Sequence, residues 1–448
     1  MQKTLLDARL WLAISGLLIL TISGCAASPN PTTTPVPTSI PLLTNTPTLV
    51  PTNTLPPTST STPLPTNTPP PTSTLPVLRS EISLGKQRVM VLLARFPDVE
   101  PQITLDKARE RIFTHLDTYI RQMSYEQTWL EGEVKGWYTL DNPVSYYSIS
   151  AHNLQVDRDR VTSLVQEVIN RADGDVNVSD YPNVLIILGA PKDAYGMMGY
   201  CAYPGMLGWA DTSPFASESG EVISNGVAVY CENAHVGVLA HDLIHILGGI
   251  VGGQRVAPCL YDHDLQGQPG EFRGHYQFYL VNMGFWDPMS CHFYEWNSPP
   301  PGLSSWTKLR LNWITPSRVT MVNPGETDTI SLGPLADGTS GTLVIKIPLS
   351  PTTYYLVENR QSIGADENLP GSGMLILYAD DTVAECRHGE APVKIVDADP
   401  SVPQLEGAAF DIGKGKRDTF TDAEHNITIK LLGKTGYSYE ILVTAAQE

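Results

Sequence analysis

One short segment, residues 241–248 (HDLIHILG), holds the residue types of this chain best suited to chemistry. Two histidines four positions apart lie on the same face of a helix, so His241 and His245 can reach one metal ion. Asp242 places a carboxyl group directly after the first histidine, and Gly248 permits a sharp exit from the helix. The spacing therefore predicts a metal-binding helix with an acidic side chain beside the metal. The alternative is a pair of hydrogen-bonded core histidines without a metal.

The acidic residue departs from the pattern that zinc peptidases use. In their H-E-x-x-H helix, the histidines hold Zn²⁺ and the Glu between them is the general base for the attacking water. Here Asp242 stands at the Glu position. Asp has similar intrinsic acidity, but its carboxylate lies one methylene nearer the backbone, and a misplacement of about 1 Å can cost on the order of 100-fold in rate. We therefore expect Asp242 to be the catalytic residue, and we expect the enzyme to be less active than a peptidase with Glu at this position.

The segments before residue 236 predict the elements that position this helix. Residues 86–98 and 181–189 are rich in consecutive apolar residues, which is typical of buried strands. Residues 105–123 and 160–172 repeat apolar residues at helical spacing, with Thr104 as N-cap of the first helix. This order predicts an α+β core, to which the metal helix contributes residues 236–248.

The apolar pattern changes to a period of two after about residue 318, which indicates strands. We therefore expect an all-β, sandwich-like domain over residues 318–448, following an α+β domain over residues 78–317. The expected strands are residues 342–347, 354–357, 374–378, 426–431 and 437–443. Acidic turns at residues 379–381 and 397–399 could hold Ca²⁺, and simple solvated turns are the alternative.

The first 77 residues have the composition of a targeting segment and a linker. Lys3 and Arg9 precede an apolar run that is short for a membrane span and ends at Cys25. Residues 22–25 (ISGC) resemble a bacterial lipobox, which implies a lipoprotein signal peptide over residues 1–25 and a lipid on Cys25; an ordinary signal peptide is the alternative. Residues 26–77 are rich in Thr, Pro and Ser, which predicts a disordered linker. We expect a protein on the extracellular face of a bacterial membrane, or a secreted one.

Charge and cysteine content limit the partners. The net charge of -18 argues against nucleic acid. Six cysteines are present, and five remain when Cys25 is set aside. An odd number means that at least one thiol is unpaired, a metal ligand, or paired between chains. The expected partners are a protein or peptide substrate and, through the lipid, the membrane.

Several segments in the order found here resemble the M6 peptidases, the immune inhibitor A type of secreted zinc metallopeptidase. Together they span most of residues 80–440. They are residues 96–98 (FPD), 124–125 (SY), 136–138 (GWY), 241–248, 286–289 (WDPM), 306–316, 354–360 (YYLVENR) and 369–373 (LPGSG). The resemblance implies a zincin-like fold with a mixed sheet, a zinc ion, endopeptidase activity, and Met289 in a Met-turn beneath the metal.

The chain departs from this family at Asp242 and again after the helix. Residues 248–253 (GGIVGG) are inserted before the segment whose acidic residue can complete the family's metal shell, and Cys259 replaces the first Asp of that segment. Asp262, His263 or Cys259 could supply the third ligand, because zinc accepts oxygen, nitrogen or sulfur. Asp262 is favoured because it matches the family's second acidic position.

Two functional interpretations follow from the resemblance. The first is a zinc-dependent extracellular endopeptidase that hydrolyses peptide bonds with reduced activity. The second is a catalytically inactive peptidase-like protein that binds a partner or has a structural role. The state of Asp242 and the identity of the third ligand distinguish them.

Overall fold

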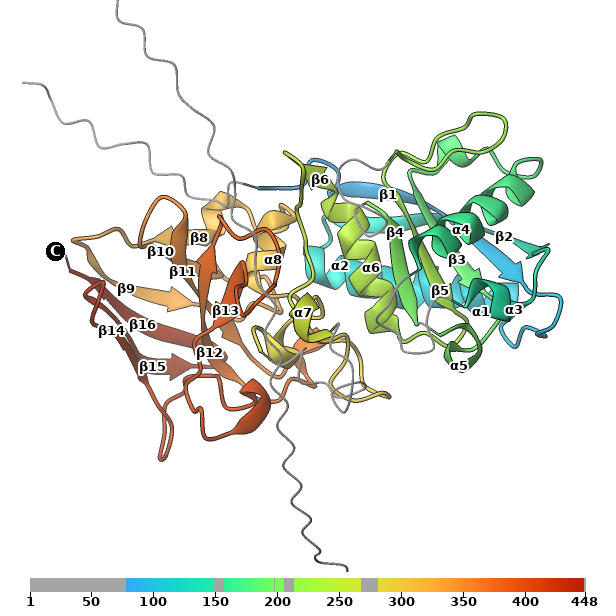
Figure 1. Ribbon diagram of the computed structural model, residues 1–448. Coiled ribbons are helices and arrows are strands. Elements are labelled where there is room, and N and C mark those ends of the chain that lie inside the picture. The colour runs from blue at the N-terminus through green and yellow to red at the C-terminus, as the bar shows by residue number, and fades with distance from the viewer. Residues whose placement is uncertain (1–77, 149–156, 197, 205–212, 267–280, 447–448) are drawn as a thin grey trace, which may run out of the picture. The chain divides into compact units, whose positions relative to one another are not determined.

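The computed structural model describes residues 78–448, except residues 149–156, 197, 205–212, 267–280 and 447–448 (Figure 1). The expected signal peptide, lipidated Cys25 and linker therefore lie outside the described residues. The described residues belong to one compact unit. Within the described part of the chain, no helix has the length and apolar character needed to cross a membrane.

The N-terminal half of this unit is built on a five-stranded mixed sheet. Its strand order is β2-β1-β3-β5-β4. The pairs β1·β2, β1·β3 and β3·β5 are parallel, while β4 runs antiparallel to β5 at the edge. The strands are β1 (Gly85–Arg95), β2 (Thr128–Thr139), β3 (Asn183–Leu188), β4 (Gly199–Tyr203) and β5 (Gly226–Cys231).

Helices cover both faces of this sheet, which explains the continuous apolar run of β1. Alternate residues of β1 belong to two different cores: Val89 and Val91 to one, Met90 and Leu92 to the other. The first core contains the long helix after β1 and the metal helix, and the second contains α4 (Figure 1). The helices are α1 (Leu105–Glu110), the π-helical Arg111–Leu116, α2 (Asp117–Ser124), α3 (Val144–Tyr147), α4 (Arg158–Ala172), α5 (Lys192–Tyr195), α6 (Val236–Gly248), α7 (His263–Gln266) and α8 (Ser305–Arg310).

Local sequence signals account for these helices. Thr104 caps α1, because its side chain accepts a hydrogen bond from the Lys107 amide. The expected helix over residues 105–123 is present as α1, the π-helical turns and α2 in succession. The expected metal helix has the bounds of α6. Short 3-10 turns lie at Val178–Asp180, Gly284–Trp286, Pro316–Arg318, Gly364–Asp366 and Pro403–Leu405.

The C-terminal region is rich in β-strands, as expected. One sheet has the order β13-β12-β11-β10-β8 and another the order β14-β15-β16-β9. Apolar residues from both sheets form one core, with Val357 and Ile376 from the first and Ile429 and Val443 from the second. The strands are β8 (Val319–Met321), β9 (Thr327–Leu332), β10 (Val344–Pro348), β11 (Thr353–Arg360), β12 (Gly373–Asp380), β13 (Val393–Ile395), β14 (Thr419–Asp422), β15 (Ile427–Thr435) and β16 (Ser438–Ala445).

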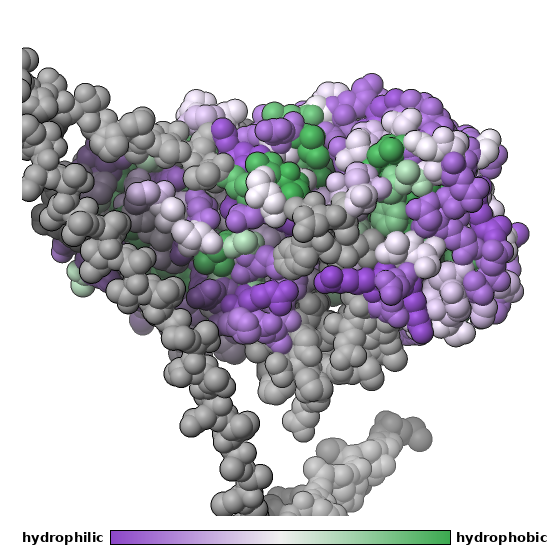
Figure 2. Space-filling model, turned by 45° about the horizontal axis from the view of Figure 1, so that its top comes forward, coloured by the Kyte–Doolittle hydropathy of each residue, from purple (hydrophilic) through white to green (hydrophobic). Residues whose placement is uncertain are grey.

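The surface carries apolar side chains in small groups. On the face drawn in Figure 2, hydrophobic patches alternate with hydrophilic side chains. Exposed large apolar residues such as Leu84, Trp296 and Tyr437 are far apart in sequence. Single exposed apolar residues are ordinary on a folded protein and assign no function by themselves.

Candidate metal centre

Helix α6 is buried almost all round, which fits its largely apolar sequence. Every residue from Gly237 to Gly248 is buried. The helix begins after His235, whose Nδ1 accepts a hydrogen bond from the Gly237 amide at 2.9 Å. It ends at Gly248, and Gly249 follows with a φ of 68°, which favours glycine. The two predicted ligands therefore lie on a fixed element inside the core.

A tight hairpin follows this helix. Strands β6 (Ile250–Val251) and β7 (Gln254–Arg255) pair antiparallel. Gly252 and Gly253 between them have φ values of 58° and 81°, which suits a two-residue hairpin turn. The Val256 amide then donates to the Gly249 carbonyl at 3.0 Å. The insertion thus returns the chain to the end of α6, where residues 257–259 lie beside the histidines.

Three buried donor atoms converge at this point. His241 Nε2 and His245 Nε2 are 3.0 Å apart. Cys259 Sγ lies 3.7 Å from His241 Nε2 and 3.4 Å from His245 Nε2. A tetrahedral zinc ion with ordinary bond lengths separates two nitrogens by roughly 3.3 Å and a nitrogen from a sulfur by roughly 3.6 Å. The His241–His245–Cys259 cluster could therefore hold a metal ion.

The hydrogen bonds of the two imidazoles fix which nitrogens are free to bind a cation. His241 Nδ1 lies 2.9 Å from the Pro288 carbonyl oxygen, and His245 Nδ1 lies 2.6 Å from the Ala257 carbonyl oxygen. A carbonyl only accepts, so each Nδ1 is the donor and each Nε2 keeps its lone pair. Burial lowers the pKa of His241 to about 4 and that of His245 well below its usual range, which favours neutral rings. Two lone pairs that face each other at 3.0 Å are the arrangement that a cation relieves.

The cysteine of the cluster is buried beside a cation. Burial raises the pKa of the Cys259 thiol to about 11, and the positive charge of Arg255 acts in the opposite direction. Arg255 Nη1 lies 4.0 Å from the sulfur. A metal ion needs the thiolate form, so binding at this site releases a proton. Arg255 lowers the cost of that thiolate.

The structure places Cys259 in the cluster, whereas the sequence comparison with the M6 pattern favours Asp262. The Asp262 carboxylate accepts hydrogen bonds from the Asp264 amide at 2.9 Å and the Gly389 amide at 3.0 Å. His263 lies on α7 with its ring 5.2 Å from that of Tyr261. The three-ligand cluster contains neither residue. The sequence made Cys259 a candidate ligand because it replaces an acidic residue. It gave no reason to prefer Cys259 to Asp262, because zinc binds both sulfur and carboxylate oxygen.

Asp242 is buried between the helix and the edge strand β4. Its Oδ2 has no hydrogen-bond partner. A Cβ added at Gly199 of β4 would lie 2.6 Å from that oxygen, so the carboxyl group packs against the strand backbone. Burial raises the pKa of Asp242 well above its usual range, and Arg255 opposes this shift. Without a bound cation, the carboxyl group is therefore held toward its protonated form.

The expected Met-turn lies against the metal helix. Met289 is fully buried, and its carbonyl accepts a hydrogen bond from the Leu260 amide at 2.8 Å. The preceding residue, Pro288, supplies the carbonyl that accepts from His241. Beyond the turn, the His292 ring lies edge-on to His241 with 4.5 Å between centroids. Its position just past the Met-turn in the sequence makes His292, like Tyr294, a candidate for stabilising the oxyanion, with aromatic packing as the alternative.

The acidic turns of the C-terminal region use their carboxylates locally. Asp380 Oδ1 accepts hydrogen bonds from the amide and hydroxyl of Thr382. Asp399 Oδ1 accepts from the amide and hydroxyl of Ser401. Among the residues that the structure describes, the group with metal-ligand geometry is the His241–His245–Cys259 cluster. All five cysteines in this part of the chain are buried free thiols.

Comparison with known proteins assigns no family to the chain. No protein-family model matches it. No curated protein matches it either. The geometry of the cluster and the sequence motifs around it are therefore the evidence on function.

Proposed function

We propose that this protein is a zinc-dependent endopeptidase of the M6-like class, anchored by a lipid on Cys25 to the extracellular face of a bacterial membrane. The observation that carries the proposal is the convergence of His241 Nε2, His245 Nε2 and Cys259 Sγ within 4.8 Å of one another. Three protein ligands are typical of catalytic zinc sites, whereas structural sites have four. Within the described residues, the cluster contains three.

The surrounding fold supports a zincin-like assignment. The sheet is mixed, and its antiparallel edge strand β4 packs on the metal helix through Gly199, where an added Cβ would lie 2.5 Å from Val238 Cγ1. The segment over residues 286–289 packs beneath His241, as the M6 resemblance implies for a Met-turn. Of these two arrangements, the second involves segments that carry the resemblance, residues 241–248 and 286–289.

The side chains of the site have separate tasks in this mechanism. The Pro288 and Ala257 carbonyls orient the two histidines so that each Nε2 faces the metal position. Zinc bound there would supply the Lewis acidity that activates water toward a peptide carbonyl. Asp242, once ionised, would accept the water proton and pass it to the leaving amine. The raised pKa of Asp242 and its shorter side chain both predict a slow enzyme.

A second candidate function is an inactive peptidase-like protein that uses the same fold to bind a partner. The observation in its favour is the state of Asp242, whose Oδ2 is buried, faces Gly199 and has no hydrogen-bond partner. A general base must lie within hydrogen-bond reach of the proton that it abstracts. Both candidates share the metal site and differ in what Asp242 does.

Metal analysis and cleavage of casein by three proteins distinguish the two candidates. The purified protein should contain close to one zinc per chain, and it should cleave casein slowly. Asp242→Ala should lose the activity, and Asp242→Glu should increase it, because the longer side chain restores the usual base. Zinc binding with equal activity in the wild type and Asp242→Ala would reject the enzyme. If no zinc binds, the metal site itself is rejected.

A further inference from the structure

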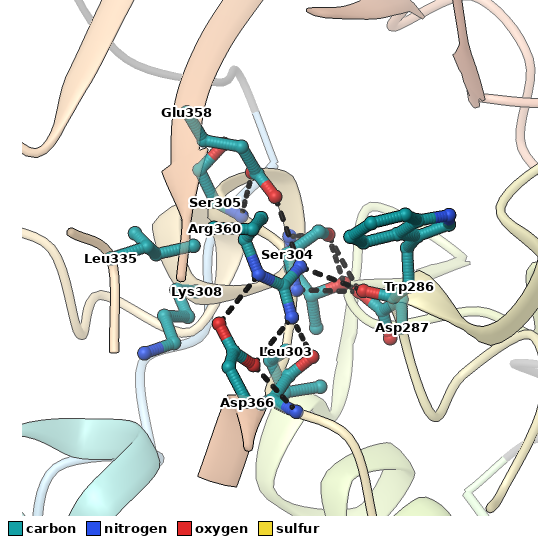
Figure 3. Close-up of polar contacts among 12 residues, drawn as sticks. Trp286, Asp287, Leu303, Ser304, Ser305, Lys308, Leu335, Glu358, Arg360 and Asp366 are labelled. Carbon is teal, nitrogen blue, oxygen red and sulfur yellow. Dashed lines mark hydrogen bonds and ion pairs between the residues drawn. The ribbon is translucent and has the colours of Figure 1, made fainter. Parts of the chain in front are cut away.

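A buried network of charged and polar residues joins the C-terminal β region to the turn beneath the metal helix (Figure 3). We call it the Arg360 network. It contains two residues of β11, one residue of the 3-10 turn that follows, the turn residue Asp287, and the N-terminus of α8. Its members are Asp287, Ser304, Ser305, Thr307, Glu358, Arg360 and Asp366.

Arg360 lies at the centre of the network and uses its guanidinium in several directions. Its Nε and Nη2 donate to the Asp366 carboxylate at 2.7 Å each, and Nη1 donates to Glu358 at 3.0 Å. The same Nη1 donates to the Trp286 carbonyl at 2.8 Å, and Nη2 donates to the Gly302 carbonyl at 2.9 Å. Figure 3 shows the guanidinium between Asp366 and the turn that carries Trp286. Only the planar fork of arginine provides this set of donors.

Asp287, the residue after Trp286, connects the turn to the N-terminus of α8. Its Oδ2 accepts hydrogen bonds from the Ser304 amide at 2.9 Å, the Ser304 hydroxyl at 2.6 Å and the Thr307 hydroxyl at 2.8 Å. Its Oδ1 accepts from the Met289 amide at 2.8 Å. The residues on both sides of Pro288 are therefore held by side chains, and Asp287 is completely buried.

Pro288 connects this network to the metal cluster. Its carbonyl accepts the hydrogen bond from His241 Nδ1 that fixes the tautomer and direction of the ring. The neighbouring Trp286 carbonyl is held by Arg360. We therefore propose that Arg360, a residue of the C-terminal β region, is a positioning residue for the metal centre and acts through the turn over residues 286–289.

The burial of the network argues for a task beyond general stability. Arg360 and Glu358 are fully buried, and Asp366 is 2% exposed. Buried ion pairs contribute little net stability, because desolvation offsets their attraction, but they define one arrangement of the chain. Here they fix the guanidinium that holds the Trp286 carbonyl, two residues before Pro288. The inference rests on the proposed metal site, because it names the group that orients one ligand.

The test measures metal affinity and ligand geometry in the full chain after removal of metal with a chelator. Zn²⁺ affinity is measured by competition, and Co²⁺ is used as a probe whose visible bands and thiolate charge-transfer band report coordination. Arg360→Lys keeps the positive charge but loses the fork. We expect zinc binding to weaken on the order of 10-fold, as for other outer-shell partners of metal ligands, with shifted cobalt bands.

Ile429→Ala is the matched control, because Ile429 is fully buried in the core between the two C-terminal sheets and lies outside the network. It should lower the stability of the protein and leave the zinc affinity and the cobalt spectrum unchanged. If Arg360→Lys does not fold, Thr307→Val replaces it, since this variant removes one hydrogen bond to Asp287 and keeps the side-chain shape. It should weaken zinc binding severalfold and shift the cobalt bands.

Each outcome decides the proposal. A folded network variant with wild-type zinc affinity and cobalt spectrum overturns the positioning role. Equal losses in Ile429→Ala and the network variant also overturn it, because the effect would then follow stability alone. A wild type that binds no zinc rejects the metal site and this inference together. Loss of casein cleavage at Asp242 does not affect the result, because the readouts here are affinity and spectrum.

Discussion

At the scale of single residues, Cys259 stands where the M6 pattern has the first Asp of the segment after the helix, one of the three positions that could supply the third ligand. Its sulfur lies within 3.7 Å of both histidine Nε2 atoms, while the Asp262 oxygens accept backbone hydrogen bonds. A thiolate donates more electron density than a carboxylate and makes a longer bond to zinc. We therefore expect a thiolate in place of a carboxylate ligand to change the reactivity of the bound zinc and to keep the zinc affinity of the site.

Removal of this ligand should abolish tight zinc binding. Cys259→Ala deletes one of three ligands, and we expect the zinc affinity to fall by more than the roughly 10- to 100-fold typical of outer-shell changes. Cys231→Ala is the matched control, since Cys231 is also a buried free thiol but lies outside the cluster. Competition with a chromophoric chelator measures both. Equal affinities in the two variants would contradict the assignment of Cys259.

At the scale of elements, the contact of β4 with α6 sets the position of Asp242. Gly199 allows the strand backbone to approach the helix so closely that an added Cβ would lie 2.5 Å from Val238 Cγ1 and 2.6 Å from Asp242 Oδ2. A larger residue must push the two elements apart. The strand and the catalytic candidate are therefore coupled by packing.

We expect Gly199→Ala to destabilise the protein by about 1–3 kcal/mol, as overpacking of a filled core usually does. Gly174→Ala is the control, because a Cβ there meets nothing within 4 Å. Urea unfolding measures both variants. Comparable stability of the two variants would show that β4 and α6 are less tightly packed than the structure indicates.

Helix α8 also carries a buried lysine, Lys308, which is 1% exposed. Its Nζ donates to the Tyr125 hydroxyl at 3.0 Å, and burial lowers the pKa of Lys308 to about 7. An unfolded lysine titrates near 10.4, so the unfolded chain binds more protons between about pH 7 and 10.4. The unfolding free energy contributed by Lys308 therefore rises with pH across this window, and the cost of burying the charge is fully present below pH 7.

This sign gives a test by substitution. Lys308→Met has no charge to bury, so its stability relative to the wild type should be greatest near pH 7 and should decrease toward pH 10. Other groups titrate in both proteins and cancel in the difference. Urea unfolding at several pH values measures it, and a difference that does not change with pH would contradict the lowered pKa.

At the scale of the whole molecule, hydrogen bonds join the C-terminal β region to the turn over residues 286–289 and to α8. The described residues belong to one compact unit. Arg360 of β11 holds the Trp286 carbonyl, and the Glu358 carboxylate accepts from the Ser305 amide of α8 at 2.6 Å. These bonds connect segments more than 50 residues apart in the sequence.

The proposed location of the molecule is tested at the first 25 residues, which lie outside the described part of the chain. We propose that a lipid on Cys25 holds the protein at the membrane. Cys25→Ser should move it from the membrane fraction to the soluble fraction of the cell surface, because one lipidation site is lost. Detergent-free fractionation with immunodetection measures the shift. An unchanged distribution would favour anchoring by another segment.

The sequence by itself determined the elements whose signals are local. The spacing of apolar residues predicted α4 and α6, the run of aliphatic residues predicted β1 and β3, and Thr104 identified the start of α1. It did not identify β2, β4 or β5. β2 is 12 residues long, but glycines and charged residues interrupt its apolar residues, and β4 and β5 have only five and six residues. His241 and His245 share a face by helical geometry alone, so the sequence was sufficient to pair them.

Only the tertiary structure decided which other residues lie near His241 and His245. Cys259 reaches the histidines because the hairpin of β6 and β7 returns the chain, and hairpin closure depends on turn geometry and packing. Arg360 donates a hydrogen bond to the Trp286 carbonyl, which lies more than 70 positions earlier in the sequence. No local sequence pattern predicts such a contact. The state of Asp242 likewise follows from burial against Gly199. The sequence shows which side chains are able to bind a metal. The fold decides which of them meet, and the packing around them sets their pKa values.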